Sequence, residues 1–399
     1  MAIFDKLHPI SSALQDLQNC GVDSVNVVIE RFTAPFEAVI NGRRTVLAGT
    51  NNYLGLTFDQ ECIRAACEAL QQEGTGTTGS RMANGNYAAH IALERELAEF
   101  FGRKGAIVFS TGYVAILGMI TALAGPGDII LIDSDCHASI YDGCRLAGAQ
   151  FMIFKHNNIG DLEKRLRRLG KQTENTLIVV EGIYSMLGDR AILADIAAVK
   201  KNYGACILVD EAHSLGVLGK QGRGLAEEAG VEDDVDFIVG TFSKSLGTIG
   251  GYCVSNHSQL ELLRFASRPY IFTASPSPSI IASTREALKI IRARPELRSR
   301  LWENARTLYQ RLKDMDFVLG PAPSPIIPVR LKDIVKAVAF WNRLLEHGVY
   351  VNMVLPPATT DGNPLLRCSV SAGHTPEQVE QICEAFASLR DVSGPHLMS

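Results

Sequence analysis

Short apolar runs alternate with segments of helical spacing through the middle of the chain. The predicted strands lie at 106–109, 129–132, 150–154, 177–180, 206–209 and 237–239. The predicted helices between them begin near Tyr113, Ser139, Asp161 and Ala194. Because strands that alternate with helices run in the same direction, this pattern predicts an α/β fold in which helices cover both faces of a mostly parallel sheet.

The segment before this region carries a hairpin signal and a helix signal. Asn41-Gly42 joins two short apolar runs, and both positions of such a two-residue turn need a positive φ, which asparagine and glycine tolerate. Asp59 precedes a segment of helical spacing at 61–72. Its side chain can accept hydrogen bonds from the first N–H groups of that helix, so Asp59 is the predicted N-cap.

The pattern changes near residue 290. Longer helical segments at 296–315, 333–347 and 375–389 are separated by short strands, which is typical of a smaller α+β unit. We therefore predict three parts: an N-terminal arm and hairpin (1–56), a large α/β domain (57–290) and a small C-terminal α+β domain (291–399).

One long stretch has the composition of a membrane span. No charged residue occurs between Lys104 and Asp128. Ser110-Thr111-Gly112 divides this stretch into a strand and a following helix, which is typical of a buried βα unit. We therefore predict no integral membrane segment.

Composition and charge narrow the classes of function. Hydrophobic residues make up 46% and charged residues 21% of the chain, and the formal net charge is −4. No polybasic run offers a face to nucleic acid, so a nucleic-acid binder is not predicted. The nine cysteines are scattered, odd in number and without a C-x-x-C pair, which favours reduced thiols over disulfide bonds or a zinc site. With an N-terminus that lacks the pattern of a signal peptide, these features predict a cytoplasmic protein without a bound metal.

The candidate chemistry lies at the ends of the predicted strands. In a parallel sheet, ligands bind outside the carboxyl ends of the strands. Lys244 follows the strand at 237–239 and stands between two serines. Such a lysine can form a Schiff base with a carbonyl compound when its amine is held neutral. Taken alone, the stretch has an alternative interpretation as an ordinary exposed loop.

Three further strand ends carry matching groups. Ser110-Thr111-Gly112-Tyr113 opens a helix after the first of these strands, and the N–H groups at a helix start favour a phosphate. His137 follows the second strand, and Asp210-Glu-Ala-His213 follows the fifth. An ionised aspartate at this place can hold a pyridine nitrogen protonated. Together with Lys244, these groups are what pyridoxal 5′-phosphate (PLP) requires, so PLP is the predicted cofactor.

Three motifs carry a resemblance to a known family. They are Asp135-x-His137-Ala-Ser-x-x-Asp-Gly143, Val209-Asp210-Glu-Ala-His213-Ser214-x-Gly216 and Thr241-Phe-Ser-Lys244-Ser-x-Gly247. With them the chain resembles the α-oxoamine synthases, PLP enzymes of fold type I that condense an amino acid with an acyl thioester and release carbon dioxide. The resemblance runs from about residue 35 to 390. The stretches 79–85, 181–189 and 268–275 are most similar to the bacterial serine palmitoyltransferases within that family.

The resemblance implies a role for each matching position. Lys244 would form the Schiff base with PLP and move the Cα proton of the substrate. Asp210 would pair with the pyridine nitrogen, His213 would contact the phenolic oxygen of the ring, and His137 would stack on the ring face. The phosphate would be held by Gly112, Tyr113, Thr241, Ser243 and, from the partner subunit of a homodimer, Thr273.

The resemblance also implies substrates. Arg367 would bind the substrate carboxylate, because a guanidinium group can make two parallel hydrogen bonds to it. Tyr53 would complete the site from the neighbouring subunit. Leu355 departs from the pattern, since some bacterial serine palmitoyltransferases that resemble this chain carry an arginine there.

The implied reaction joins L-serine to a long-chain acyl thioester of coenzyme A, such as palmitoyl-CoA, or of acyl carrier protein. Its product would be 3-ketosphinganine, formed in the first step of sphingolipid synthesis. One alternative is an enzyme of the 8-amino-7-oxononanoate synthase or glycine C-acetyltransferase type. Another is a non-catalytic scaffold subunit of the same fold, although such a subunit would be expected to lack Lys244.

Overall fold

The chain forms two compact units. The computed structural model describes residues 2–19, 27–356, 358–359 and 362–389. The larger unit consists of 51–185 and 189–299, and the smaller unit consists of 1–50, 186–188 and 300–399. The smaller unit therefore contains segments from both ends of the chain. The three-part division at residues 56 and 290 stays a prediction.

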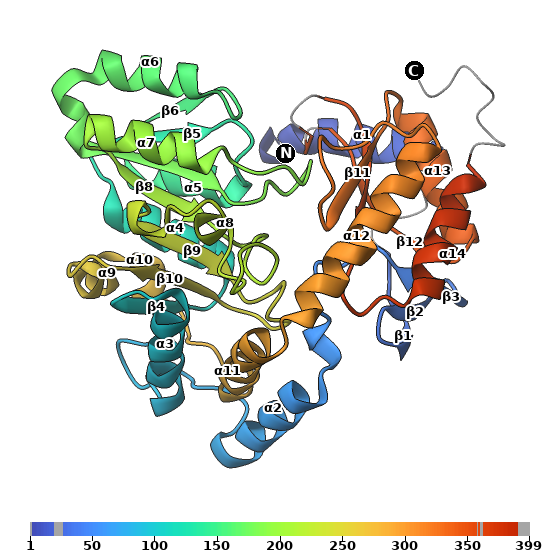
Figure 1. Cartoon of the computed structure of the whole chain (residues 1–399), viewed down its shortest axis with the longest axis horizontal. Helices are drawn as coiled ribbons and strands as arrows, with labels where there is room; N and C mark the ends of the chain where they lie inside the picture. The colour runs from blue at the N-terminus through green and yellow to red at the C-terminus, as the bar shows by residue number, and fades with distance from the viewer. Residues whose placement is uncertain (1, 20–26, 357, 360–361, 390–399) are drawn as a thin grey trace. The chain divides into compact units, whose positions relative to one another are not determined.

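A seven-stranded sheet forms the core of the larger unit (Figure 1). Its strands, in spatial order, are β4 (Gly105–Phe109), β10 (Gly251–Ser255), β9 (Phe237–Thr241), β8 (Cys206–Asp210), β7 (Thr176–Glu181), β5 (Ile129–Asp133) and β6 (Gln150–Phe154). Only β10 runs against its neighbours. β5 and β7 are buried along their whole lengths, which explains their apolar runs. The predicted mostly parallel sheet is confirmed.

β10 is absent from the predicted strands. Gly250 and Gly251 indicated a turn, but Gly251 begins the strand. A Cβ atom at Gly251 would lie 2.4 Å from the carbonyl oxygen of Thr111, so glycine allows the two backbones to approach each other. β10 pairs with β4, which lies far away in the sequence, and such pairing leaves little local signal.

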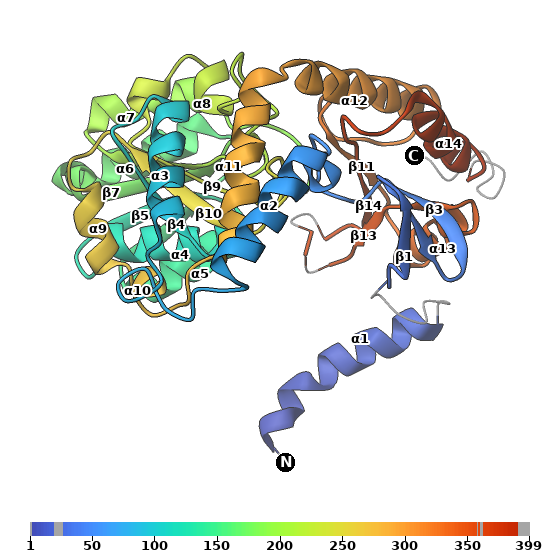
Figure 2. The same ribbon diagram turned by 90° about the horizontal axis from the view of Figure 1, so that it is seen from below.

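Helices cover both faces of this sheet. α6 (Ile159–Leu169) and α7 (Leu193–Tyr203) pack together on one face, and α4 (Gly112–Leu123) and α5 (Ala138–Ala147) pack together on the other (Figure 2). The uncharged stretch after Lys104 therefore forms β4 and α4. In the part of the chain that the structure describes, no helix has both the length and the apolar character needed to cross a bilayer.

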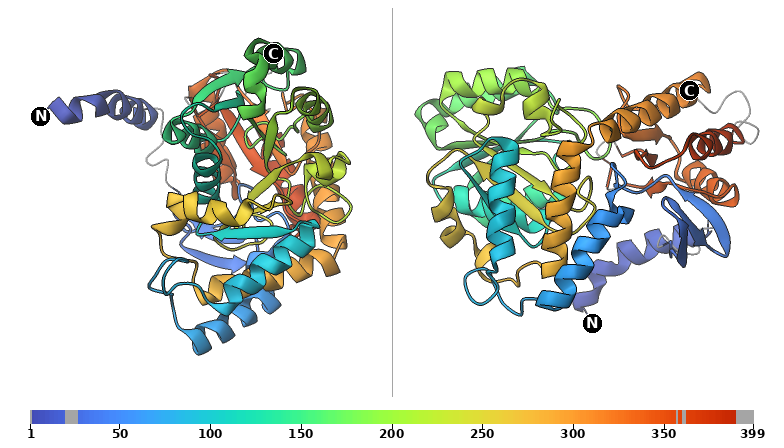
Figure 3. Two further views of the ribbon diagram at one scale, coloured as in Figure 1. Left: turned by 90° about the vertical axis from the view of Figure 1, so that its left-hand side faces the viewer. Right: turned by 60° about the horizontal axis from the view of Figure 1, so that its bottom comes forward.

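Further helices complete the larger unit. α2 packs along α11, which also contacts α3 (Figure 3). The side chain of Asp59 accepts hydrogen bonds from the N–H groups of Glu61 and Cys62, which confirms the predicted N-cap of α2. The bounds are η2 (Leu56–Phe58), α2 (Gln60–Glu73), α3 (Ala88–Phe101), η3 (Gly170–Asn175), α8 (Leu225–Glu228), η4 (Glu232–Asp234), α9 (Leu260–Ala266), α10 (Arg268–Ile271) and α11 (Pro278–Ala293).

The smaller unit contains two sheets. One has the order β1 (Arg31–Ala34), β2 (Glu37–Ile40), β3 (Arg43–Leu47) and β12 (Val349–Tyr350), and the other has the order β11 (Ile326–Arg330), β14 (Leu365–Ser369) and β13 (Asn352–Val354). The predicted hairpin is confirmed, because β2 and β3 pair antiparallel and Asn41 and Gly42 have φ values of 50° and 71°. The helices are η1 (Ala2–Leu7), α1 (His8–Asn19), α13 (Ile334–Glu346), α14 (Pro376–Ala387) and, from residue 300 onward, α12 (Glu296–Asp314).

Candidate active site

The carboxyl ends of neighbouring strands in the larger unit bring the predicted residues together. β9, β8, β7 and β5 lie side by side and end at Thr241, Asp210, Glu181 and Asp133. Next to these ends is a cavity of about 300 Å³, a volume typical of sites for small ligands. The predicted residues that line it are Gly112, Tyr113, His137, Asp210, His213, Thr241, Ser243 and Lys244.

The start of α4 and the loop after β9 form one side of the cavity. Because α4 begins at Gly112, the N–H groups of Gly112 and Tyr113 have no acceptor within the helix. A Cβ atom at Gly112 would lie 2.6 Å from the Cβ of Thr241, so only glycine fits here. The Oγ atoms of Thr241 and Ser243 are 2.9 Å apart. Helix-start N–H groups beside clustered hydroxyls favour an anion such as a phosphate.

Asp210 is a buried carboxylate of the cavity. Its side chain is held by a hydrogen bond from the N–H of Ala212 at 2.9 Å. Burial raises the pKa of Asp210, and the positive charge of Lys244 and the hydrogen bond from the Ala212 N–H act against this rise. A cationic ring nitrogen in the cavity would favour the ionised form in the same way, so Asp210 fits a pyridinium group.

His213 is held by Tyr53. The Tyr53 hydroxyl lies 2.7 Å from Nδ1 of His213 and 3.3 Å from Oδ1 of Asn51. Both Tyr53 and His213 are buried. Tyr53 was expected to reach the site from a neighbouring subunit, and this expectation needs correction, because Tyr53 contacts His213 of its own chain.

His137 stands at the N-terminus of α5, which it caps. Its Nδ1 accepts a hydrogen bond from the N–H of Ser139 at 3.2 Å and lies 2.8 Å from Ser139 Oγ. Burial lowers the pKa of His137. The ring of Tyr113 meets the ring of His137 at 80°, with 6.3 Å between the centroids. His137 is therefore oriented by the helix that it caps, and an unprotonated Nδ1 is consistent with a neutral ring.

Glu181 also lines the cavity and was not among the predicted residues. It accepts a hydrogen bond from the backbone N–H of His137. Its carboxyl is buried, and this burial together with the nearby charge of Asp210 raises the pKa of Glu181 well above the usual value. Because Glu181 ends β7, the rule that ligands gather at strand ends could have found it.

Lys244 lies in the loop after β9 and is half-buried. It lines the same cavity as Asp210, His137 and Glu181, and its charge acts on all three groups. The lining therefore fits a ligand with an anionic group for the start of α4, a carbonyl group for Lys244 and a basic nitrogen for Asp210.

Comparison with known proteins assigns the family. The family model for aminotransferases of class I and II matches residues 45–386. The chain belongs to this family. A relative from Caulobacter vibrioides, a serine palmitoyltransferase, is 54% identical, and the match covers 98% of this chain and 96% of that protein. An 8-amino-7-oxononanoate synthase from Alkaliphilus metalliredigens is 38% identical, with 96% of each chain covered.

A solved structure of the family has the same fold. It is a variant of the Sphingomonas paucimobilis serine palmitoyltransferase with bound PLP and myriocin, and it is 48% identical to this chain. The TM-score is 0.95, and 98% of each chain is covered. The predicted resemblance and the predicted fold type I are therefore confirmed.

Some positions predicted from the family resemblance lie outside the cavity. Thr273 follows α10 and does not line the cavity. Arg367 lies on β14 of the smaller unit, where it is buried and donates a hydrogen bond to Ser369 Oγ at 3.1 Å. Leu355 follows β13 in the same unit. The roles of Thr273 and Arg367 stay predictions.

Proposed function

We propose that the protein is a PLP-dependent serine palmitoyltransferase. It joins the Cα of L-serine to the acyl carbon of a long-chain thioester such as palmitoyl-CoA. The C–S bond of the thioester breaks, the thiol leaves, and the serine carboxylate leaves as carbon dioxide, which gives 3-ketosphinganine. The proposal is carried by one observation: the lysine, aspartate and two histidines meet in one cavity of a chain that is 54% identical to a serine palmitoyltransferase.

The residues of the cavity suit PLP in one orientation. The start of α4 at Gly112 and Tyr113, with Thr241 and Ser243, would hold the phosphate. Asp210 would hold the ring nitrogen protonated. Bound PLP withdraws electrons from the bonds at the substrate Cα.

Lys244 would transfer the substrate proton, and the two histidines would orient the ring of the cofactor. Lys244 would attach the cofactor through its Nζ atom. Once the substrate amine has replaced Nζ at the cofactor, the freed Nζ would take the Cα proton of the substrate. His213, fixed by Tyr53, would donate a hydrogen bond to the phenolic oxygen of the ring. His137 would cover the ring face and exclude water from it.

The substrate carboxylate would be bound by Arg367. Its guanidinium is rigid and planar, and its hydrogen bond to Ser369 holds it in place. Because Leu355 stands where some relatives carry an arginine, Arg367 would be the main carboxylate partner in this chain.

We also propose a cytoplasmic homodimer with shared sites, to which Thr273 of the partner subunit contributes. Large apolar side chains exposed on the N-terminal helical segment, including Ile3, Leu7, Ile10 and Leu14, support a further protein contact. The eight cysteines within the described residues are all free thiols, which supports a reducing compartment; Cys20 lies outside those residues.

A substrate panel tests the reaction. Purified protein with PLP is given serine, alanine or glycine, each with palmitoyl, pimeloyl or acetyl thioesters of coenzyme A and of acyl carrier protein. Thiol release and product mass are measured. We expect 3-ketosphinganine from serine and the palmitoyl thioester, while exclusive use of alanine or glycine would overturn the proposal in favour of the alternative synthases.

Two variants test the site. Lys244→Ala should abolish the covalent PLP absorbance and turnover, whereas Lys171→Ala, at an exposed lysine outside the cavity, should keep both. Retention of both signals in Lys244→Ala would refute the role of Lys244. A wild-type protein that stays colourless with added PLP would favour the scaffold alternative.

A further inference from the structure

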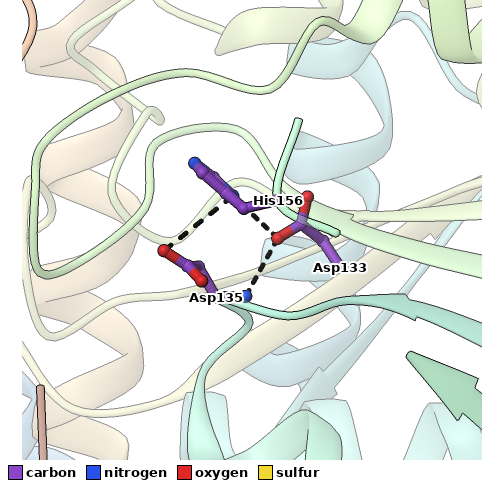
Figure 4. Close-up of side chains that lie close together, drawn as sticks. All are labelled: Asp133, Asp135 and His156. Carbon is purple, nitrogen blue, oxygen red and sulfur yellow. Dashed lines mark hydrogen bonds and ion pairs between the residues drawn. The ribbon is translucent and has the colours of Figure 1, made fainter. Parts of the chain in front are cut away.

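His156 lies between carboxylates just beyond the end of β6. Its Nδ1 is 2.8 Å from Oδ1 of Asp133, and its Nε2 is 2.6 Å from Oδ2 of Asp189. Asp135 lies on the same side of the ring as Asp133, with its Oδ2 4.0 Å from Nδ1 (Figure 4). The His156 side chain is 23% exposed, and that of Asp133 is fully buried.

The hydrogen bonds define the protonation state of this ring. Each ring nitrogen lies within hydrogen-bond distance of a carboxylate oxygen, and a ring that donates to both carboxylates carries a proton on each nitrogen. Burial lowers the pKa of His156, but the hydrogen bonds to Asp133 and Asp189 outweigh this effect and raise the pKa to about 10. Asp133, Asp135 and His156 offer atoms within 4.8 Å of one another, a spacing that could suit a metal ion. A doubly protonated ring has no lone pair for a metal and supplies the positive charge itself.

On one side, His156 holds the loop that leads to His137. The carboxylate of Asp133 accepts a hydrogen bond from the N–H of Asp135 at 2.9 Å. The backbone N–H of His156 donates to Ser134 Oγ at 3.1 Å. The short segment between β5 and α5 is therefore tied to the end of β6 by both the ring and the backbone of His156.

On the other side, His156 holds the loop that follows Glu181. The backbone carbonyl of Asp189 accepts a hydrogen bond from the N–H of Tyr184 at 2.9 Å. The ring of Tyr184 meets the His156 ring edge-on, at 89° and 4.5 Å between centroids. The two loops converge in the cavity, because the N–H of His137 donates to the Glu181 carboxylate.

We propose that His156 is a positioning residue for the active site, a cationic clamp that fixes the two loops so that His137 and Glu181 keep their places in the cavity. His156 itself does not line the cavity, so it acts only through these loops. The inference rests on the proposed function, because it assumes that His137 covers the PLP ring.

Two substitutions and one matched control test the clamp. His156→Phe keeps a ring against Tyr184 and removes both donors. His156→Gln keeps an amide that can donate to one of the carboxylates. The control is His257→Phe. His257 Nε2 lies 3.0 Å from Asp236 Oδ1, and its ring stacks on Phe237, but this pair lies at the amino ends of β8 and β9.

The readouts separate positioning from stability. For His156→Phe we expect kcat/KM to fall by roughly 10- to 100-fold, the PLP absorbance band to shift, and the dissociation constant of PLP for the apoprotein to rise by roughly tenfold. His156→Gln should lie between this variant and the wild type, and His257→Phe should match the wild type. A crystal structure of the His156→Phe apoprotein should show the hydrogen bond between His137 and Glu181 lost.

The outcomes are distinct from those that test the reaction. If the wild type does not use serine, the proposed function fails, while PLP affinity, the absorbance band and the apoprotein structure still test the clamp. If both His156 variants keep the PLP affinity, the spectrum and the contact between His137 and Glu181, the clamp is overturned even if they melt earlier. If His156→Phe does not fold, the same readouts on His156→Gln decide.

Discussion

The hydrogen bond between Tyr53 and His213 gives a prediction that tests the site before any substrate is added. Tyr53 is 0% exposed and His213 is 5% exposed, so water does not readily replace a lost partner. Tyr53→Phe keeps the ring and removes only the hydroxyl that lies 2.7 Å from Nδ1 of His213. The substitution leaves no large cavity, and the hydrogen bond is therefore the main loss.

The size of the effect follows from this burial. Removal of one partner of a buried hydrogen bond costs roughly 1–3 kcal/mol. In a domain of this size, each kcal/mol lowers the melting temperature by about 2–4 °C. Because His213 is proposed to contact the PLP ring, the dissociation constant of PLP should rise as well, by roughly fivefold for each kcal/mol that affects binding.

The assay compares two tyrosines. Tyr252 is also 0% exposed, but no hydrogen-bond partner for its hydroxyl exists among the described residues. Tyr252→Phe should therefore leave the melting temperature unchanged or raise it slightly. Both variants and the wild type are melted as apoproteins and followed by circular dichroism. Tryptophan fluorescence would not report on the surroundings of Tyr53, because Trp302 and Trp341 both lie in the smaller unit and Tyr53 lies in the larger one.

Two results would refute the reasoning. The first is a Tyr53→Phe protein with the melting temperature and PLP affinity of the wild type. The second is an equal loss of stability in Tyr53→Phe and Tyr252→Phe, which would show that the buried hydroxyl contributes through packing and not through its hydrogen bond.

Two further predictions concern the start of α4 and a buried acid. Gly112→Ala places a Cβ atom 2.6 Å from the Cβ of Thr241, so the start of α4 must move. A titration with PLP should show that the affinity of the protein for PLP falls about tenfold or more. An unchanged affinity would contradict this packing. Burial raises the pKa of Glu211 from 4.5 to about 7. The folded state therefore binds the proton more tightly, and stability should fall by on the order of 3 kcal/mol as pH rises from 4.5 to 7. The free energy of unfolding of Glu211→Gln, measured with urea at each pH, should lack this decrease. If the variant and the wild type differed by the same free energy at every pH, Glu211 would not be the group that titrates.

The sequence pattern located most of the candidate site. Each short apolar run predicted a buried strand, and the polar residues after those runs were predicted to lie at one edge of a sheet. Asp210, His137 and Lys244 do line one cavity. This was possible because strands that alternate with helices run in one direction, so the residues at their carboxyl ends could be predicted from their order along the chain.

Other features were decided only by the tertiary structure. β10 forms by pairing with β4 and β9, and β12 joins β3, pairing Val349 with Val46. The partner of His213 is Tyr53, which lies 160 residues earlier.

The physical reason is that periodicity in a sequence reports how one segment is buried, while a pairing or a buried hydrogen bond depends on which distant segments the whole fold brings together. For this protein, the sequence by itself determined the chemistry at the strand ends. Tertiary packing decided which strands are neighbours and which side chains hold the groups of the candidate site in place.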